Sequence, residues 1–301
     1  KMRIDIHMTP IPTKLDSFSL ASHLKRGPAE HKGHAGKVIL VGGAPGMAGA
    51  LLLAGNACLH LGAGWTMLEM LDPASAKADS SQPELMIRLA EAQATNALMH
   101  HAPDVIAVGP GLGNSPLAQT WLKACLEYQQ IPLILDADAI NLIADSQELL
   151  SALQKRNLQF PGQSVMTPHP GEAAKLLKSS VAQVQAQRQS SLEQLLALTH
   201  SIIVLKGQHT LIAGPNHSTL QCEDGNPSMG TGGMGDVLTG SIAAIAAQGV
   251  RHHLHLWQAT CLAVELHAKA ADSLVNKGVG PIGLTPTEII LEMRSLLNKL
   301  L

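Results

Sequence analysis

KVILVGGAPGMAGALLLAGNACLHLGAGWTMLEM, residues 37–70, contains one complete strand–helix–strand unit. The apolar run 38–41 is typical of a buried strand, and the glycines that follow it predict a loop. Residues 50–61 are apolar nearly all round, which predicts a helix buried on both sides. Residues 65–70 form the second expected strand. A strand, a helix and a strand in this order indicate a parallel sheet covered by helices.

The same alternation continues along the rest of the chain. Further strands are expected at 104–108, 132–136, 163–167 and 202–205, a hairpin at 210–213 and 217–222, and helices at 117–129, 182–200, 237–248, 254–274 and 287–300. This order predicts an α/β fold with a mostly parallel central sheet and helices on both faces.

The first 31 residues differ from the rest because they show little periodicity. They predict an extended arm with one short helix near 17–25, and regular structure is expected to start at Lys37. With no linker or internal repeat after residue 31, we expect an N-terminal arm, 1–31, and one domain, 32–301.

The composition suits this fold and excludes several functions. Hydrophobic residues make up 46% and charged residues 15%, with only 3 Trp, 1 Tyr and 2 Phe, so aliphatic side chains must fill the core. A net charge of −2 without a basic stripe argues against nucleic-acid binding. The widely spaced Cys58, Cys125, Cys222 and Cys261 indicate reduced core thiols. No apolar run is long enough for a signal peptide or a membrane span, so a cytoplasmic location is expected.

The stretch 225–240, GNPSMGTGGMGDVLTG, carries the strongest functional signal. Glycines let backbone N–H groups approach an anion, and a helix that starts here points its N–H groups and positive dipole end at the same place. Asp236 stands there, where a carboxylate is a poor phosphate ligand but a good base for a hydroxyl that attacks phosphorus. The stretch therefore favours phosphoryl transfer to an alcohol. The alternative is a glycine-rich turn with Asp236 as a helix cap.

Other motifs follow the C-terminal ends of the expected strands, where open α/β sheets bind ligands. Gly109, Gly111 and Gly113 follow one strand and indicate close approach of the backbone to a ligand, with a sharp strand-to-helix turn as the alternative. Asp136 and Asp138 follow the next strand. Their carboxylates are candidates for holding Mg²⁺, with helix capping by Asp138 as an equal alternative.

Two further strand ends carry charged or rigid motifs. In 167–172, TPHPGE, two prolines fix His169, which favours contact with a substrate. Glu172 is equally a candidate for complementing a helix dipole and for a metal ligand. In 206–210, KGQHT, Lys206 is placed where it can reach a phosphate, with a solvated loop lysine as the alternative.

Two further patterns argue against a dinucleotide-binding fingerprint and against a histidine metal cluster. The glycines of the first loop, at 43, 46 and 49, lack the G-x-G of a dinucleotide-binding fingerprint and favour a loop that packs close to another ligand. His100-His101 and His252-His253-x-His255 lie at expected helix ends or loops without a supporting carboxylate pattern, which predicts surface histidines rather than a metal cluster.

Taken together, these motifs resemble the ADP/ATP-dependent NAD(P)H-hydrate dehydratases, a family with a ribokinase-like three-layer fold. The resemblance runs from about residue 30 to the end and rests on residues 32–36, 49–50, 62–64, 109–113, 136–139, 167–172, 205–207 and 232–236. Two positions depart from the family pattern: Met234 replaces the usual Thr, and 285–288, TPTE, replaces the usual Ala-Ser/Thr-Asp and predicts helix capping.

The resemblance implies a repair reaction. A nucleotide phosphorylates the 6-hydroxyl of hydrated NADH or NADPH (NADHX or NADPHX), and loss of phosphate restores the cofactor. It implies a lyase that uses ADP, with ATP as the alternative donor, together with Mg²⁺, in a homotetramer. It also implies an NAD(P)HX epimerase as a partner, and the start at Lys1 leaves room for one in a preceding domain.

The residue roles implied by the resemblance fall into three groups. Asp236 is the expected catalytic base, and the hydrated cofactor is expected to contact Ala50, Gly111, Gly113, His169 and Asp236. The nucleotide is expected to contact Lys206, Gly207, Gln208, His209, Thr210, Gly232, Gly233 and Gly235. Asp136, Asp138 and Glu172 are the candidates for a metal.

Two other functions fit parts of the pattern. A ribokinase-like kinase of a vitamin alcohol would share the glycine-rich loop and Asp236, and its product would be a stable phosphate ester. A non-catalytic dinucleotide-binding module would keep the contacts of Gly111 and His169 without a need for Asp236.

Overall fold

The structure is a computed structural model that describes residues 11–301. Its strands are β1 Thr13–Lys14, β2 Lys37–Gly42, β3 Trp65–Met70, β4 Met86–Leu89, β5 Val105–Val108, β6 Leu133–Leu135, β7 Ser164–Met166, β8 Ile202–Leu205, β9 Leu211–Gly214 and β10 His217–Gln221. Its α-helices are α1 Ala48–His60, α2 Ala94–His101, α3 Pro116–Glu127, α4 Ala137–Asp145, α5 Gln147–Gln159, α6 Pro170–Leu176, α7 Val181–Ala186, α8 Arg188–Thr199, α9 Met234–His252, α10 Leu256–Asn276 and α11 Pro286–Leu300. Two 3₁₀ helices are η1 Phe18–Leu24 and η2 Pro227–Gly230.

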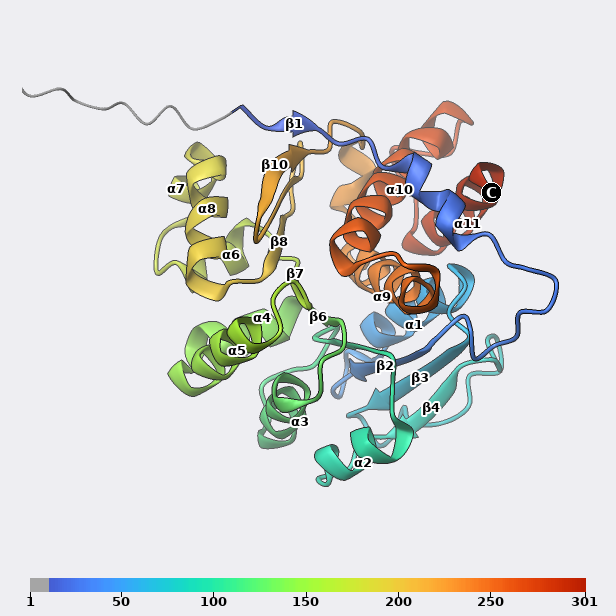
Figure 1. Ribbon diagram of the computed structural model, residues 1–301, viewed down its shortest axis with the longest axis vertical. Helices are drawn as coiled ribbons and strands as arrows, with labels where there is room; N and C mark the ends of the chain where they lie inside the picture. The colour runs from blue at the N-terminus through green and yellow to red at the C-terminus, as the bar shows by residue number, and fades with distance from the viewer. Residues whose placement is uncertain (1–10) are drawn as a thin grey trace, which may run out of the picture.

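The strands form one sheet, and helices cover both of its faces (Figure 1). The strand order within the described residues is β1-β10-β9-β8-β7-β6-β5-β2-β3-β4. The seven strands from β8 to β4 in this order pair in parallel, and β9 is antiparallel to both of its neighbours. The predicted three-layer α/β architecture is therefore confirmed.

Two hydrophobic clusters, one on each face of the sheet, fill the space between the strands and the helices. One face packs against η1, α1, α9, α10 and α11, and the other against α2 through α8. Helix α1 is the apolar helix of the first strand–helix–strand unit, and it packs closely on α9, where Gly240 lets the two backbones meet. This packing fixes the N-terminus of α9 over the sheet, which matters for the site. The four cysteines are buried and free, as predicted.

Several predicted boundaries were wrong. Regular structure begins at Thr13 rather than Lys37, because β1 adds to β10 at the edge of the sheet. The short helix near 17–25 is confirmed as η1, while residues 1–10 of the predicted arm lie outside the described residues. The helix predicted at 182–200 is two helices, α7 and α8, separated at Gln187. Helix α9 begins at Met234, three residues before the prediction.

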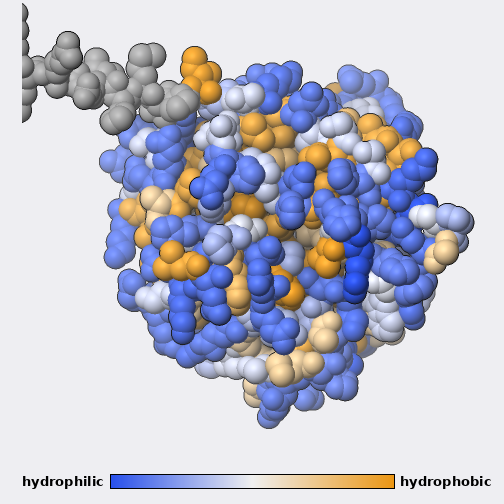
Figure 2. Space-filling model, viewed as in Figure 1, coloured by the Kyte–Doolittle hydropathy of each residue, from blue (hydrophilic) through white to orange (hydrophobic). Residues whose placement is uncertain are grey.

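The face of the molecule in Figure 2 is mostly hydrophilic, with hydrophobic residues in small scattered groups. None of the helices within residues 11–301 has the length and apolar character needed to cross a membrane. The motif 285–288 caps α11, because Thr285 and Glu288 form a reciprocal capping box, as predicted.

Candidate active site

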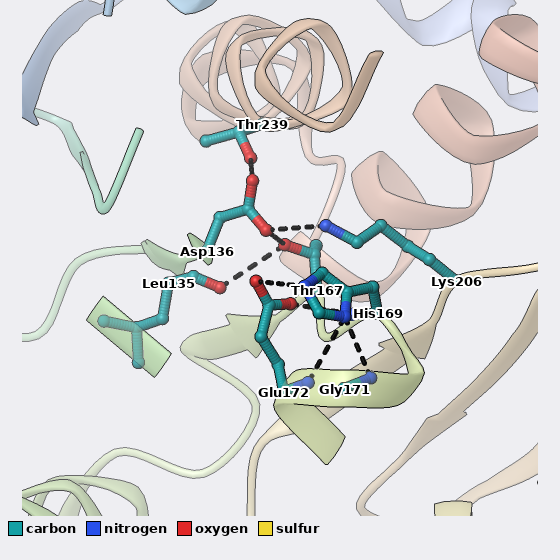
Figure 3. Close-up of polar contacts among 8 residues, drawn as sticks. All are labelled: Leu135, Asp136, Thr167, His169, Gly171, Glu172, Lys206 and Thr239. Atoms are coloured by element: carbon teal, nitrogen blue, oxygen red, sulfur yellow. Dashed lines mark hydrogen bonds and ion pairs between the residues drawn. The ribbon is translucent and has the colours of Figure 1, made fainter. Parts of the chain in front are cut away.

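Polar side chains meet where three neighbouring strands end (Figure 3). Asp136 follows β6, Thr167 follows β7 and Lys206 follows β8, and these strands are paired in parallel. Lys206 Nζ lies 2.9 Å from Asp136 Oδ1, which also accepts a hydrogen bond of 2.7 Å from the Thr167 hydroxyl. Thr239 of α9 donates to Asp136 Oδ2 at 2.8 Å. The network ties α9 to the sheet.

The Asp136 carboxylate is only 1% exposed, yet it is held in its charged form. Burial alone would raise its pKa, but attraction to Lys206 and hydrogen bonds from Thr167, Lys206 and Thr239 outweigh burial and bring the pKa below its ordinary value. Burial would likewise lower the pKa of Lys206, but the neighbouring carboxylates raise it. The two residues form a buried ion pair that fixes the position of the Lys206 ammonium group.

Asp236 differs from Asp136 in its surroundings. It lies in the first turn of α9 and is half-buried, and no donor within residues 11–301 makes a hydrogen bond to its carboxylate. Burial, reinforced by Asp136, raises its pKa to about 7, and Lys206 opposes the shift. A carboxylate with a pKa near neutrality is suited to take up a proton and release it again. Because Gly233 is the N-cap, Asp236 does not cap the helix.

The N-terminus of α9 is open and lies against Lys206. Gly233 has no side chain to accept from the first-turn N–H groups, which leaves those of Gly235 and Asp236 without a cap. A Cβ atom built on Gly235 would lie 3.1 Å from Lys206 Nζ. The glycine therefore lets the ammonium group approach the helix terminus, where both favour negative charge.

A rigid turn holds His169 at the start of α6 (Figure 3). Its Nδ1 accepts hydrogen bonds from the backbone of Gly171 at 2.9 Å and Glu172 at 3.3 Å. Glu172 accepts from the His169 backbone at 2.7 Å, and its other oxygen lies 3.2 Å from His169 Nε2. Burial and the nearby Lys206 lower the pKa of His169, and burial raises the pKa of Glu172 to about 7. The imidazole is neutral at pH 7, and its side chain is still 56% exposed.

Residues of the predicted binding loops line two cavities. A cavity of about 550 Å³ is lined by residues 206–210, by 222–227, and by Gly235 and His267 among others. All five residues of the predicted nucleotide loop and Gly235 line it. Gly232 and Gly233 are not among its lining residues, although they precede α9 directly.

The second cavity, of about 440 Å³, is lined by Met47, Gly113 and Asp138 among others. The Gly113 backbone donates to Asp138 at 2.8 Å. A Cβ atom on Gly111 would lie 3.2 Å from the Cβ of Ala50, so these two predicted substrate residues are neighbours. Asp138, beside Gly113, and Lys206, from the predicted nucleotide loop, both lie close enough to Asp236 to affect its pKa.

The candidate metal ligands all have protein partners. Asp136 accepts from three donors, Asp138 accepts from Gly113, and Glu172 accepts from His169. Within residues 11–301 no group of three or more His, Cys, Asp or Glu side chains could hold a metal ion. The described residues therefore do not fit a metal site made of protein ligands alone.

The prediction that these histidines lie at the surface is partly wrong. His101 lies 4.0 Å from the buried Glu69, and His252 lies 3.2 Å from Glu30, with side-chain exposures of 12% and 14%. Each has the carboxylate neighbour that the local pattern did not reveal, because Glu69 and Glu30 are distant in sequence. His253 and His255 are exposed as predicted.

Sequence reasoning missed several residues of the site. Thr239 follows Asp236 by three positions, so helical spacing alone places both on one side of α9. The cavity wall at 222–227 could have been found from the start of the glycine-rich stretch, since Gly225 and Asn226 belong to it. His267 gave no local signal. It comes from the middle of α10, which reaches the cavity only through helix packing.

Comparison with known proteins identifies relatives in sequence and in structure. The family model of the NAD(P)H-hydrate dehydratases (Carb_kinase) matches residues 38–294. A bifunctional NAD(P)H-hydrate repair enzyme of Leishmania braziliensis is 36% identical over 290 residues, which cover 91% of this chain and 51% of that protein. An ADP-dependent (S)-NAD(P)H-hydrate dehydratase of Neisseria meningitidis is 36% identical over 288 residues, which cover 92% of this chain and 91% of that protein.

A solved structure extends the likeness to three dimensions. The ADP/ATP-dependent NAD(P)H-hydrate dehydratase of Bacillus subtilis, co-crystallized with ATP/Mg²⁺, matches with a TM-score of 0.76 at 26% identity, covering 93% of this chain and 97% of that one. The predicted ribokinase-like fold is confirmed. The chain spans about half the length of the bifunctional relatives that it matches.

Proposed function

Because the chain belongs to the NAD(P)H-hydrate dehydratase family, we propose that it uses ADP to convert hydrated NADH or NADPH back to NADH or NADPH. One observation carries the proposal. Asp236, with its pKa near 7, stands at the open N-terminus of α9, beside Lys206 and the cavity that residues 206–210 line. A base, a cation and free helix N–H groups are the parts that phosphoryl transfer to an alcohol requires.

Asp236 acts first, as the base. Its carboxylate takes the proton of the substrate 6-hydroxyl while the hydroxyl oxygen attacks the terminal phosphorus of the nucleotide. The bond from that phosphorus to the leaving oxygen breaks, so ADP leaves AMP and the substrate becomes a phosphate ester. In the second step the lone pair of the ring nitrogen expels inorganic phosphate from C6 and leaves an iminium ion. Loss of a proton from C5 to water then restores the nicotinamide double bond. Phosphate leaves far more readily than hydroxide, which explains why phosphorylation precedes the elimination.

Lys206 and the α9 terminus stabilise the charge on the phosphoryl group. Asp136 holds Lys206 Nζ at 2.9 Å, so the ammonium group is already in position when the nucleotide binds. Preorganised cations and N–H groups stabilise a transition state without having to reorient during the reaction. The adjacent cavity of about 550 Å³ is large enough for most of a nucleotide.

The hydrated cofactor must bring its 6-hydroxyl group to Asp236. We assign its binding to Ala50, Gly111, Gly113 and His169. The neutral His169 is fixed by the α6 turn and half-exposed, which suits it to contact a substrate. Gly113 also lines the second cavity, of about 440 Å³.

We propose that Mg²⁺ binds together with the nucleotide. Mg²⁺ is commonly bound through one or two carboxylates together with substrate phosphates. The described residues have no three-ligand cluster of their own, which is why we attribute most of its ligands to phosphate oxygens and water. From the family resemblance we also propose a homotetramer in the cytoplasm and cooperation with an NAD(P)HX epimerase. Sedimentation of the purified protein tests the tetramer.

The test of the function uses absorbance at the NADH band. Purified protein is mixed with Mg²⁺ and acid-hydrated NADH, and ADP or ATP is added in turn. We expect a rise that depends on the nucleotide, faster with ADP than with ATP. No rise with either donor, together with nucleotide consumption when a vitamin alcohol is supplied, would favour a kinase instead.

A further inference from the structure

The loop 206–210 is held from outside the cavity by an arginine that plays no part in the proposed chemistry. Arg188 is the first residue of α8. Its Nη2 donates to the carbonyl of Leu205 at 3.0 Å and its Nη1 to the carbonyl of Lys206 at 3.2 Å. Nη2 also reaches the carbonyl of His209, at 3.5 Å. One guanidinium group therefore connects the two ends of the loop.

Gly207 shows how closely the guanidinium packs. Its φ is +134°, and a Cβ atom built on it would lie 2.7 Å from Arg188 Nη1. An L side chain at this position would meet both a strained backbone and the arginine. The glycine and the arginine thus fit one another, and the loop has little freedom to move toward α8.

The direction of the carbonyls fixes the direction of the N–H groups. In a trans peptide the C=O and N–H bonds point to opposite sides. Since the carbonyls of Lys206 and His209 point at Arg188, the N–H groups of Gly207 and Thr210 point away from it. Gly207 and Thr210 both line the cavity, and no acceptor in the described part of the chain takes a hydrogen bond from either N–H group.

We propose that Arg188 is a positioning residue for the nucleotide: it orients the loop 206–210 so that backbone N–H groups face the phosphates or ribose of a nucleoside diphosphate. The inference rests on the proposed function, because it requires the cavity to be the nucleotide site. Arg188 itself stays behind the loop and touches no reacting atom. Its effect should therefore appear in nucleotide affinity and not in the chemical step.

Arg156 offers a matched control. It is 3% exposed and also donates to backbone carbonyls, those of Tyr128 at 2.8 Å and Ile131 at 2.6 Å. These carbonyls precede β6, at the end of the sheet opposite the site. Replacing either arginine with Lys keeps the charge but loses the planar fork that bridges several acceptors. A general loss of stability should follow from both changes, and a loss of nucleotide affinity only from Arg188→Lys.

The experiment measures ADP binding by calorimetry, and KM for ADP and for hydrated NADH by steady-state kinetics. We expect Arg188→Lys to weaken ADP binding about tenfold or more, the usual effect of losing charged hydrogen bonds, with kcat and the KM for hydrated NADH nearly unchanged. Arg156→Lys should leave ADP affinity unchanged. Wild-type ADP affinity in Arg188→Lys, or an equal loss in both variants, would overturn the inference.

Two further measurements distinguish a failure of this inference from a failure of the proposed function and from misfolding of the variant. If the wild-type protein itself binds no ADP, the nucleotide site fails rather than the role of Arg188 within it, and the inference falls with it. If Arg188→Lys does not fold, Gly207→Ala tests the same fit while keeping the arginine. It should weaken ADP binding, and wild-type affinity in that variant would contradict the inference.

Discussion

Replacing Lys206 with Met removes the cation from the buried ion pair while keeping most of the side-chain length. Asp136, which is 1% exposed in the wild-type protein, would keep only the hydroxyl donors Thr167 and Thr239. Breaking a buried pair by removing one partner costs roughly 3–5 kcal/mol, because the remaining charge is uncompensated. Since the Lys206 side chain is 21% exposed, water will enter the space, and we expect a loss of about 3 kcal/mol at pH 8.

The sign of the pH dependence makes this prediction specific. In the wild-type protein the pKa of Asp136 is lowered, so its stabilisation is present above the unfolded pKa and is lost only in acid. Without Lys206, burial dominates and the pKa rises above its unfolded value. The folded variant can then protonate Asp136, and its stability should fall as pH increases through the raised pKa.

Urea unfolding at pH 5 and pH 8 measures both effects. The stability difference between Lys206→Met and wild type should be larger at pH 8. The double variant Asp136→Asn/Lys206→Met, which has neither charge, should be more stable at pH 8 than Lys206→Met alone. A loss below about 1 kcal/mol, far under the range for a broken buried pair, or an equal loss at both pH values, would refute the reasoning.

Three other perturbations test separate parts of the site and fold. Because Asp236 must be ionised to act as a base and its pKa is raised to about 7, kcat should increase with pH through that value; a pH–rate profile that is flat there would contradict the assignment. Gly235→Ala places a Cβ atom 3.1 Å from Lys206 Nζ and should raise the KM for ADP. Gly27→Ala, whose Cβ would meet only Glu30 Oε1 at 3.8 Å, should leave it unchanged, and equal effects of the two changes in steady-state kinetics would argue against the close approach. Burial raises the pKa of Glu69 to about 7, so the cost of burying its charge is absent below about pH 4.5 and complete above about pH 7. Glu69→Gln should therefore increase the free energy of unfolding at pH 8 by up to about 3 kcal/mol. An equally large increase at pH 4 would contradict this prediction.

The sequence was informative wherever a local pattern has a single structural solution. The apolar runs before Asp136, Thr167 and Lys206 predicted buried strands, and parallel pairing places their ends together. The network among these residues follows from that arrangement, although they lie far apart along the chain. The glycine-rich approach to Asp236 likewise predicted a helix start, and the structure places it only three residues earlier than expected.

The sequence was uninformative where a feature depends on contacts between distant segments. Strand β1 has two residues and exists because β10 offers it an edge. Arg188 looks like an ordinary exposed helix residue until α8 packs beside the loop 206–210. His101 and His252 found carboxylate neighbours through packing that no local spacing records.

The most direct test compares wild type and Asp236→Asn in a single-turnover reaction with hydrated NADH, Mg²⁺ and ADP, following the NADH band together with AMP and phosphate. We predict one AMP and one phosphate for each NADH with the wild-type protein. The variant should still bind ADP but form NADH about 10²–10⁴ times more slowly, the usual effect of losing a well-placed base. NADH formation without a nucleotide, or equal rates in the two proteins, would contradict the account.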